Sequence, residues 1–140
     1  MSLSGFTDYL SDKILNHLRG NAAFTMPAGL YVGLFSAAPT AAGGGTEVTT
    51  TIRVAGRLAA TFGAPSAVTA GRSIANTAAV DYGASAGAAS VTHFGVFDAA
   101  SAGNLLWYAP VPTPLSITTG INVSFAIGAL TTAIKQVTDV

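Results

Sequence analysis

Two histidines and a few carboxylates are the residues of this chain that could support metal or acid–base chemistry. Neither His17 nor His93 has a second histidine, a cysteine or a carboxylate at the spacing of metal ligands. Asp81 and Asp98 could meet in three dimensions as the carboxylate pair of a glycosidase. The chain has only six acidic and six basic residues, however, which is fewer polar groups than enzymes normally use. We therefore interpret His93 as a structural or interface residue.

The remaining catalytic motifs give the same result. The chain contains no cysteine, which excludes disulfides, cysteine–zinc sites and a thiol nucleophile. The glycine runs at 43–45 and 83–87 are not followed by a helix that begins with Lys-Ser or Lys-Thr, so they are interpreted as flexible loops and not as phosphate sites. The sequence predicts no catalytic residue, no metal ligand, no cofactor and no small-molecule substrate.

Arg53 and Arg57 are the clearest polar pair. They lie four residues apart within 47–62, where apolar and polar positions alternate as in a strand, so we expect them on one face. Two solvated charges that protect a sheet edge would explain the pair. Bidentate docking to acidic groups of a neighbouring subunit would also explain it. Both alternatives stay open.

Trp107 and Tyr108 are adjacent in a predicted strand, 105–111, so their side chains should point to opposite faces. We expect Trp107 to share the core face with Leu105. Tyr108 then becomes the candidate interface aromatic.

Composition indicates a protein that works in an assembly. Half of the 140 residues are hydrophobic, only 9% are charged and the formal net charge is zero, whereas soluble domains are typically about 25% charged. A neutral chain lacks the basic face that nucleic-acid binding requires. Its longest nearly apolar stretches are far shorter than the roughly 20 residues of a membrane span. With little charge to keep copies apart, we expect a homo-oligomer, with a dimer favoured over a trimer.

One amphipathic helix is predicted, over residues 4–19. Apolar residues recur every four positions, Ser2 or Ser4 can cap its start, and Gly20 is a natural stop. Asp8 and Asp12 are interpreted as a solvated face. The expected partner contacts on this helix are Phe6, Tyr9, Leu10 and Ile14. We expect removal of residues 1–19 to weaken assembly and to leave the rest of the chain folded.

After Pro27 the pattern changes to short strands separated by small-residue turns. The predicted strands are 29–37, 47–62, 73–82, 91–99, 105–111, 117–127 and 130–137. A loop over 38–46, turn regions over 63–72 and 83–90 and the prolines within 112–114 separate them. This pattern indicates a mainly β fold, an antiparallel β-sandwich or jelly-roll-like barrel of seven or eight strands preceded by one N-terminal α-helix. We predict a single domain over 1–140, with the helix in 1–20, the sandwich in 28–137 and a C-terminal tail in 138–140.

Several blocks of the sequence, in order, resemble a family of small structural proteins of tailed-bacteriophage virions. The most specific blocks are LYVGLFSAAPT (30–40) and VTHFGVFDAASAGNLL (91–106), and DYLSDKILNHLRG (8–20) and NVSFAIGALT (122–131) flank them. Members of this family are described as tail-fibre-like or as capsid cement and decoration proteins. The resemblance covers most of the chain and implies no catalytic residue.

The resemblance implies a non-enzymatic virion protein made in the bacterial cytoplasm. Our leading hypothesis is a capsid cement protein on the outer capsid surface that bridges subunits of the major capsid protein and stabilises the shell by its binding energy. The alternative is a tail, neck or fibre-attachment component. The repeats of a long fibre are missing, which favours a compact cement or adaptor. A third class, a carbohydrate-binding or hydrolytic module, would need exposed aromatics, but Tyr31, Tyr82, Trp107 and Tyr108 are scattered among predicted core positions.

Overall fold

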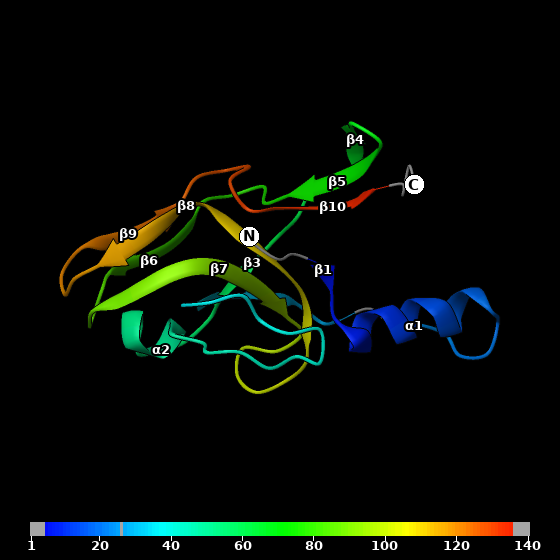
Figure 1. The fold of residues 1–140 in the computed structure, drawn as a ribbon, viewed down its shortest axis with the longest axis horizontal. Coiled ribbons are helices and arrows are strands. Elements are labelled where there is room, and N and C mark those ends of the chain that lie inside the picture. The colour runs from blue at the N-terminus through cyan, green and yellow to red at the C-terminus, as the bar shows by residue number, and fades with distance from the viewer. Residues whose placement is uncertain (1–4, 26, 136–140) are drawn as a thin grey trace.

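The computed structural model describes residues 5–25 and 27–135, of which 45% lie in strands that pair antiparallel (Figure 1). The elements, in chain order, are β1 (Gly5–Phe6), α1 (Asp8–Leu18), β2 (Leu30–Phe35), α2 (Thr49–Ile52), β3 (Leu58–Ala60), β4 (Ser66–Val68), β5 (Gly71–Ala75), β6 (Val80–Ala84), β7 (Ala89–Phe97), β8 (Leu105–Ile117), β9 (Asn122–Phe125) and β10 (Thr131–Lys135). The strands form sheets with the orders β1-β8-β7-β2-β3, β10-β5-β4 and β6-β9.

The predicted class, mainly β and antiparallel, is confirmed. The sheets do not close into a barrel, a jelly-roll topology is not confirmed, and the described residues form ten strands where seven or eight were predicted. The predicted tail, 138–140, and the candidate caps Ser2 and Ser4 lie outside the described residues. Neither described helix has the length and apolar character that crossing a membrane requires.

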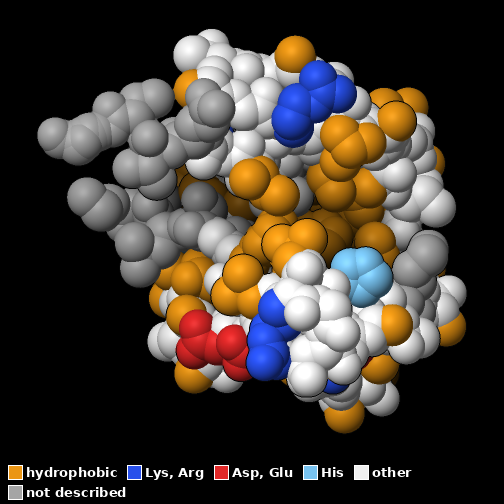
Figure 2. Space-filling view, turned by 90° about the vertical axis from the view of Figure 1, so that its right-hand side faces the viewer, with side chains coloured by type: hydrophobic (Ala, Val, Ile, Leu, Met, Phe, Trp, Pro, Cys, Tyr) orange, Lys and Arg blue, Asp and Glu red, His pale blue; other side chains and the backbone are white. Residues whose placement is uncertain are grey.

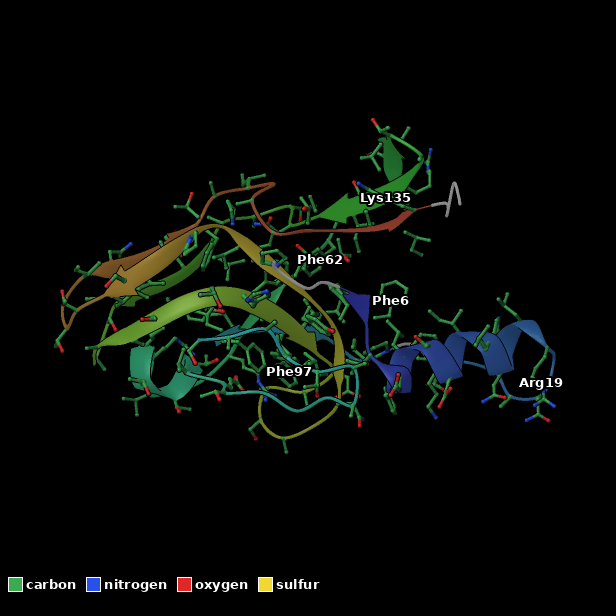
Figure 3. All side chains as sticks on the ribbon, in the orientation of Figure 1. Phe6, Arg19, Phe62, Phe97 and Lys135 are labelled. Atoms are coloured by element: carbon green, nitrogen blue, oxygen red, sulfur yellow. The ribbon has the colours of Figure 1, made fainter. Side chains whose placement is uncertain are left out.

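Strand β2 of the five-stranded sheet is buried on both faces from Val32 to Phe35, as its apolar sequence predicts. Strand register puts Val32 opposite Val96 and Leu34 opposite Phe94 on the face that packs toward β6 and β9. The other face carries a second cluster, composed of Phe35, Phe97, Leu105 and Tyr108. Phe62 and Phe97, labelled in Figure 3, lie on the first and second of these faces.

Tyr82 joins the two layers of the main core. Its ring meets Phe125 edge to face at 6.4 Å between centroids, and its hydroxyl donates a 2.6 Å hydrogen bond to the carbonyl oxygen of Val32 in β2. Burial raises the pKa of the Tyr82 phenol well above its ordinary range, because ionisation would place a charge in the core.

The burial of the Tyr82 phenol predicts a contribution to the pH dependence of stability, and Tyr82→Phe should remove that contribution. Above the ordinary tyrosine pKa of about 10 the unfolded chain loses the Tyr82 proton and the folded chain keeps it. The free energy of unfolding should therefore fall as pH rises above 10, with a contribution from this residue of about 1.4 kcal/mol per pH unit. Tyr82→Phe should cost about 1 kcal/mol at neutral pH through its lost hydrogen bond, and its stability should then decline less steeply. Urea unfolding from pH 8 to 11 measures both slopes, and parallel curves would contradict the prediction.

The predicted strand at 47–62 is wrong over most of its length. Residues Thr49–Ile52 form a helical turn that buries Ile52, Gly56 has a φ of +87° that bends the chain, and β3 is the one strand within the segment. The alternating pattern gave a wrong prediction because its apolar residues do not lie on one buried face. Ile52 is fully buried, whereas Val54 is 80% exposed. Arg53 and Arg57 consequently do not share a strand face.

Three other segments differ from the predicted strands and turns. The predicted strand at 73–82 is two strands in different sheets, joined at Asn76, whose buried amide donates to the carbonyl oxygens of Ala78 and Ala126. The turn region 63–72 contains β4. The clean alternation at 117–127 is broken by a turn at Gly120, whose φ is +90°, before β9 begins.

The prolines within 112–114 do not close a strand, because β8 continues through them to Ile117. The register passes from Val91 opposite Leu115 to His93 opposite Pro110, so Thr92 faces four residues of β8. Prolines are tolerated at such a bulge because residues there are not required to donate a backbone N–H to the neighbouring strand.

Candidate interaction surface

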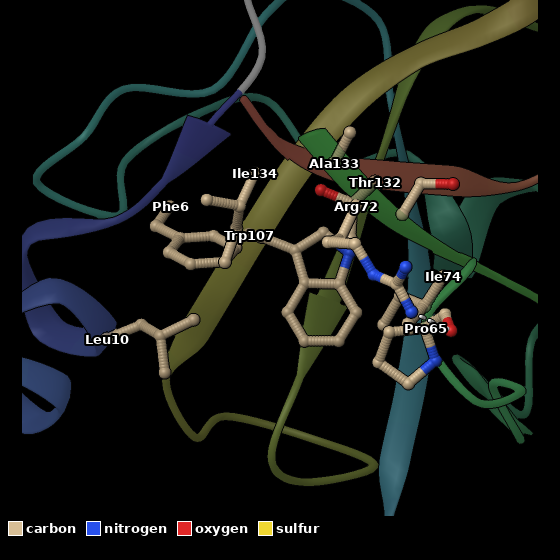
Figure 4. Close-up of a pocket in the computed structure, with 10 residues that line it drawn as sticks. Phe6, Leu10, Pro65, Arg72, Ile74, Trp107, Thr132, Ala133 and Ile134 are labelled. Atoms are coloured by element: carbon tan, nitrogen blue, oxygen red, sulfur yellow. Dashed lines mark hydrogen bonds between the residues drawn. The ribbon is translucent and has the colours of Figure 1, made fainter. Parts of the chain in front are cut away.

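An apolar groove opens at one end of the molecule, between α1 and the sheet β10-β5-β4. Figure 2 looks at this end and shows hydrophobic side chains gathered in the hollow. The groove encloses about 160 Å³ and is lined by Phe6, Leu10, Pro65, Arg72, Ser73, Ile74, Trp107, Thr132, Ala133 and Ile134 (Figure 4). We call these residues the end groove.

The floor of the end groove is made where the first and eighth strands meet. Phe6 in β1 pairs with Trp107 in β8, and the Trp107 indole meets Phe62 edge to face at 5.5 Å between centroids. Trp107 is buried, as the sequence predicts, but it shares its face with Ala109 and not with Leu105, which belongs to the second cluster. Phe6 and Leu10, which we predicted as partner contacts, therefore lie beside Trp107, which we predicted only as a core residue.

Thr7 fixes the base of α1 to β8. It is almost completely buried, its hydroxyl donates to the carbonyl oxygens of Leu105 and Leu106 at 2.6 and 3.1 Å, and its backbone N–H donates to Leu106 at 2.9 Å. The same hydroxyl accepts from the N–H of Leu10, which makes Thr7 the N-cap of α1. The helix therefore begins at Asp8, four residues later than predicted, because Gly5–Phe6 is used as a strand.

Beyond its base, α1 extends away from the sheets, with Arg19 at its far end (Figures 1 and 3). One apolar stripe runs along it, from buried Leu10 through half-buried Ile14 to Leu18, which is 74% exposed. Leu15 is 60% exposed beside the stripe. The exposed Leu15 and Leu18 are apolar surface that the described residues do not cover, which is typical of an interaction site.

The opposite wall of the end groove is the sheet face formed by β5 and β10. Register puts Thr132 opposite Ile74 and Ile134 opposite Arg72, and the Arg72 guanidinium donates a 2.9 Å hydrogen bond to the carbonyl oxygen of Pro65. Gly71 permits this pairing, because a Cβ there would overlap the carbonyl oxygen of Ile134. This wall is thus a hydrogen-bonded, largely apolar face with one cation in it.

Arg57 belongs to an internal network on the other side of the five-stranded sheet. Its Nε and Nη2 donate to the two carboxylate oxygens of Glu47 at 3.0 and 2.8 Å, and its Nη1 donates to the carbonyl oxygens of Ala99 and Ala102. Its guanidinium carbon lies 3.3 Å from the centre of the Phe97 ring. Glu47 also accepts a 2.6 Å hydrogen bond from Thr49. The network holds α2 and the loop after β7 over the second cluster.

Arg53 and Tyr108 are also away from the end groove. Arg53 lies where α2 ends and donates one hydrogen bond to the carbonyl oxygen of Gly56. Tyr108 points to the face opposite Trp107, as predicted, but it is buried under its own chain and is not the exposed aromatic that we expected. The structure therefore gathers Phe6, Tyr9, Leu10 and Ile14 around α1, and it separates Arg53, Arg57 and Tyr108 from them. The partner roles of all seven stay predictions.

The candidate catalytic groups do not converge. Asp81 accepts from the N–H of Gly83 at a register shift within β6, and Asp98 accepts from the N–H and side-chain amide of Asn104 in the β7–β8 loop, so each carboxylate is bonded within its own segment. Residues 83–87 read Gly-Ala-Ser-Ala-Gly, the pattern of a serine nucleophile elbow. Ser85, however, is buried and donates to the carbonyl oxygen of Gly87, in a turn that leads to a strand and not to a helix. Within residues 5–25 and 27–135, no three histidine, aspartate or glutamate residues gather as a metal site would require.

Comparison with known protein families places the chain in a family of phage proteins. A family model described as podophage GP4 fiber I protein gp80 matches residues 5–133, from β1 into β10. No curated protein matches the chain.

Proposed function

Because this chain belongs to the family of podophage GP4 fiber I proteins, we propose that it is a structural subunit of the fibre apparatus of the phage particle. A structural protein of the virion is what the family itself implies. The observation that carries the narrower proposal is the match to a fiber protein over nearly the whole described fold. The proposed role is mechanical, with binding surfaces and no reaction.

The surface of the protein supports this role. The end groove and the exposed stripe of α1 are apolar and lie at the same end of the molecule. Interfaces of lasting assemblies have apolar centres of this kind, depleted of charge. A subunit held in an assembly through this end would keep its opposite end, with the β8–β9 turn, available for other contacts.

The capsid cement hypothesis, which led from the sequence alone, receives no specific support from the family. A cement protein and a fibre subunit differ most in copy number, because cement covers the whole shell and fibres occur at one vertex.

Quantitative mass spectrometry of purified virions distinguishes these two positions. The measured quantity is the molar ratio of this chain to the major capsid protein, with chemical cross-linking to identify its neighbours. We expect a small fraction of the capsid copy number and cross-links to tail or fibre proteins. A ratio near one, with cross-links to the major capsid protein, would overturn the proposal in favour of cement.

A further inference from the structure

We propose that two copies of this chain form a two-fold symmetric dimer in which the tip of α1 of each copy enters the end groove of the other. The occupant of the groove is therefore Leu18 of the second copy. The inference goes beyond the proposed function, because it concerns the protein in solution and holds wherever the protein lies in the virion.

Shape and polarity make the helix tip and the groove complementary. The groove is an apolar hollow, and α1 carries its most exposed leucines, Leu18 and Leu15, on a segment that projects from the same end of the fold. Within the described residues of one copy, no side chain fills the groove or covers Leu15 and Leu18. Mutual insertion buries the two leucines of each copy, and the symmetry makes every such contact occur twice.

The spacing of the apolar stripe fixes the register of the two helices. Leu10 and Leu18 each lie four residues from Ile14, so an antiparallel pair centred on Ile14 places Leu18 of the second copy against Leu10. Leu10 lines the end groove. At 1.5 Å per residue, Leu18 is about 12 Å along the helix from Leu10, which lets it reach the groove of the second copy while the two Ile14 side chains meet on the axis.

Charge favours the antiparallel arrangement. The acidic residues of α1, Asp8 and Asp12, lie in its first half, and Arg19 follows its last turn. In an antiparallel pair Asp8 of one copy lies near Arg19 of the other, and the helix dipoles oppose each other. A parallel arrangement about a three-fold axis would instead bring like charges together.

The first test is the molar mass of the full chain, measured by sedimentation equilibrium over a series of concentrations. We expect a dimer for the natural chain and at least a tenfold higher dissociation constant for Leu18→Asp. The matched control is Ile127→Asp, because Ile127 is 69% exposed and lies on the loop after β9, away from α1. This control should leave the dissociation constant unchanged. A monomeric or trimeric natural chain, or equal effects of both variants, would overturn the proposal.

The second test uses the absence of cysteine from the sequence. Ile14→Cys places one thiol per copy on the proposed two-fold axis, where two cysteines come within the distance of a disulfide. Mild oxidation should convert most of this variant to a covalent dimer on a non-reducing gel, whereas Ile127→Cys should stay mostly monomeric on the same gel. Equal cross-linking of the two variants would reject the antiparallel register. Either result leaves the virion copy number, and with it the proposed function, to be decided separately.

Discussion

Arg57→Ala is expected to lower the free energy of unfolding by about 3 kcal/mol, the loss typical of breaking a buried ion pair from one side. The substitution removes four hydrogen bonds and the contact with the Phe97 ring. It also leaves Glu47 with a carboxylate that is only 27% exposed and keeps Thr49 as its hydrogen-bond donor among the described residues. Urea unfolding followed by Trp107 fluorescence measures the loss.

Arg53→Ala is the matched control for this prediction. The Arg53 side chain makes a single hydrogen bond, to the carbonyl oxygen of Gly56, so its removal should cost less than about 1 kcal/mol. Arg57→Lys should fall between the two alanine variants, because an ammonium keeps the charge and loses the planar fork that binds both oxygens of Glu47. Equal losses for Arg53→Ala and Arg57→Ala would show that the network contributes little.

Removal of residues 1–19 is expected to abolish cooperative unfolding or to lower the free energy of unfolding by about 5 kcal/mol, which reverses our expectation from the sequence. The deletion removes β1 from its pairing with β8, the buried hydrogen bonds of Thr7, and the burial of Leu10 in the main core. A buried leucine contributes about 1.5–3 kcal/mol, and each hydrogen bond of Thr7 adds about 0.5–1.5 kcal/mol.

Leu18→Ala separates the tip of the helix from its base. Because Leu18 is largely exposed in the monomer, this change should alter the stability of the monomer by less than about 0.5 kcal/mol. Thermal unfolding measures the stability of the chain without residues 1–19 and of Leu18→Ala, at a protein concentration below the dissociation constant of the proposed dimer. A truncated chain that unfolds as cooperatively as the natural one would show that α1 is an appendage after all.

Sequence-based prediction succeeded for elements whose residue types are compatible with only one local structure. The apolar run of β2, the hairpin between β7 and β8, the stop of α1 near Gly20 and the mainly β class follow from local pattern and turn chemistry. Asp98 and Asn104 close that hairpin through their own hydrogen bonds, as turn residues commonly do.

The strand predictions failed in two segments where apolar and polar residues alternate but only some of the apolar residues are buried. In 47–62 and 117–127 apolar residues stand at most alternate positions, but a helical turn, positive φ at Gly56 and Gly120, and exposed Val54 and Ile127 interrupt the strands. Period-two counting treats an exposed valine and a buried isoleucine alike, and only tertiary packing separates them.

The end groove could not be predicted from spacing, because its walls come from both ends of the chain. Phe6 and Ile134 are separated by nearly the whole sequence, and only the register of β1 on β8 and of β10 on β5 brings them together. The apolar period of α1 identified Phe6, Leu10 and Ile14, but nothing local in the sequence marks Ile74 or Trp107 as their neighbours.

The pairing of β1 with β8 also has a consequence for the order of folding. Thr7 bonds to residues 98 and 99 positions further along the chain, so this strand pair closes one of the longest loops in the fold and should form late. During synthesis the first strand leaves the ribosome long before β8 and β10 exist to receive it. A nascent chain therefore cannot present the complete groove, so the proposed dimer cannot form between copies that are still being synthesised. The topology itself would place such an association after translation.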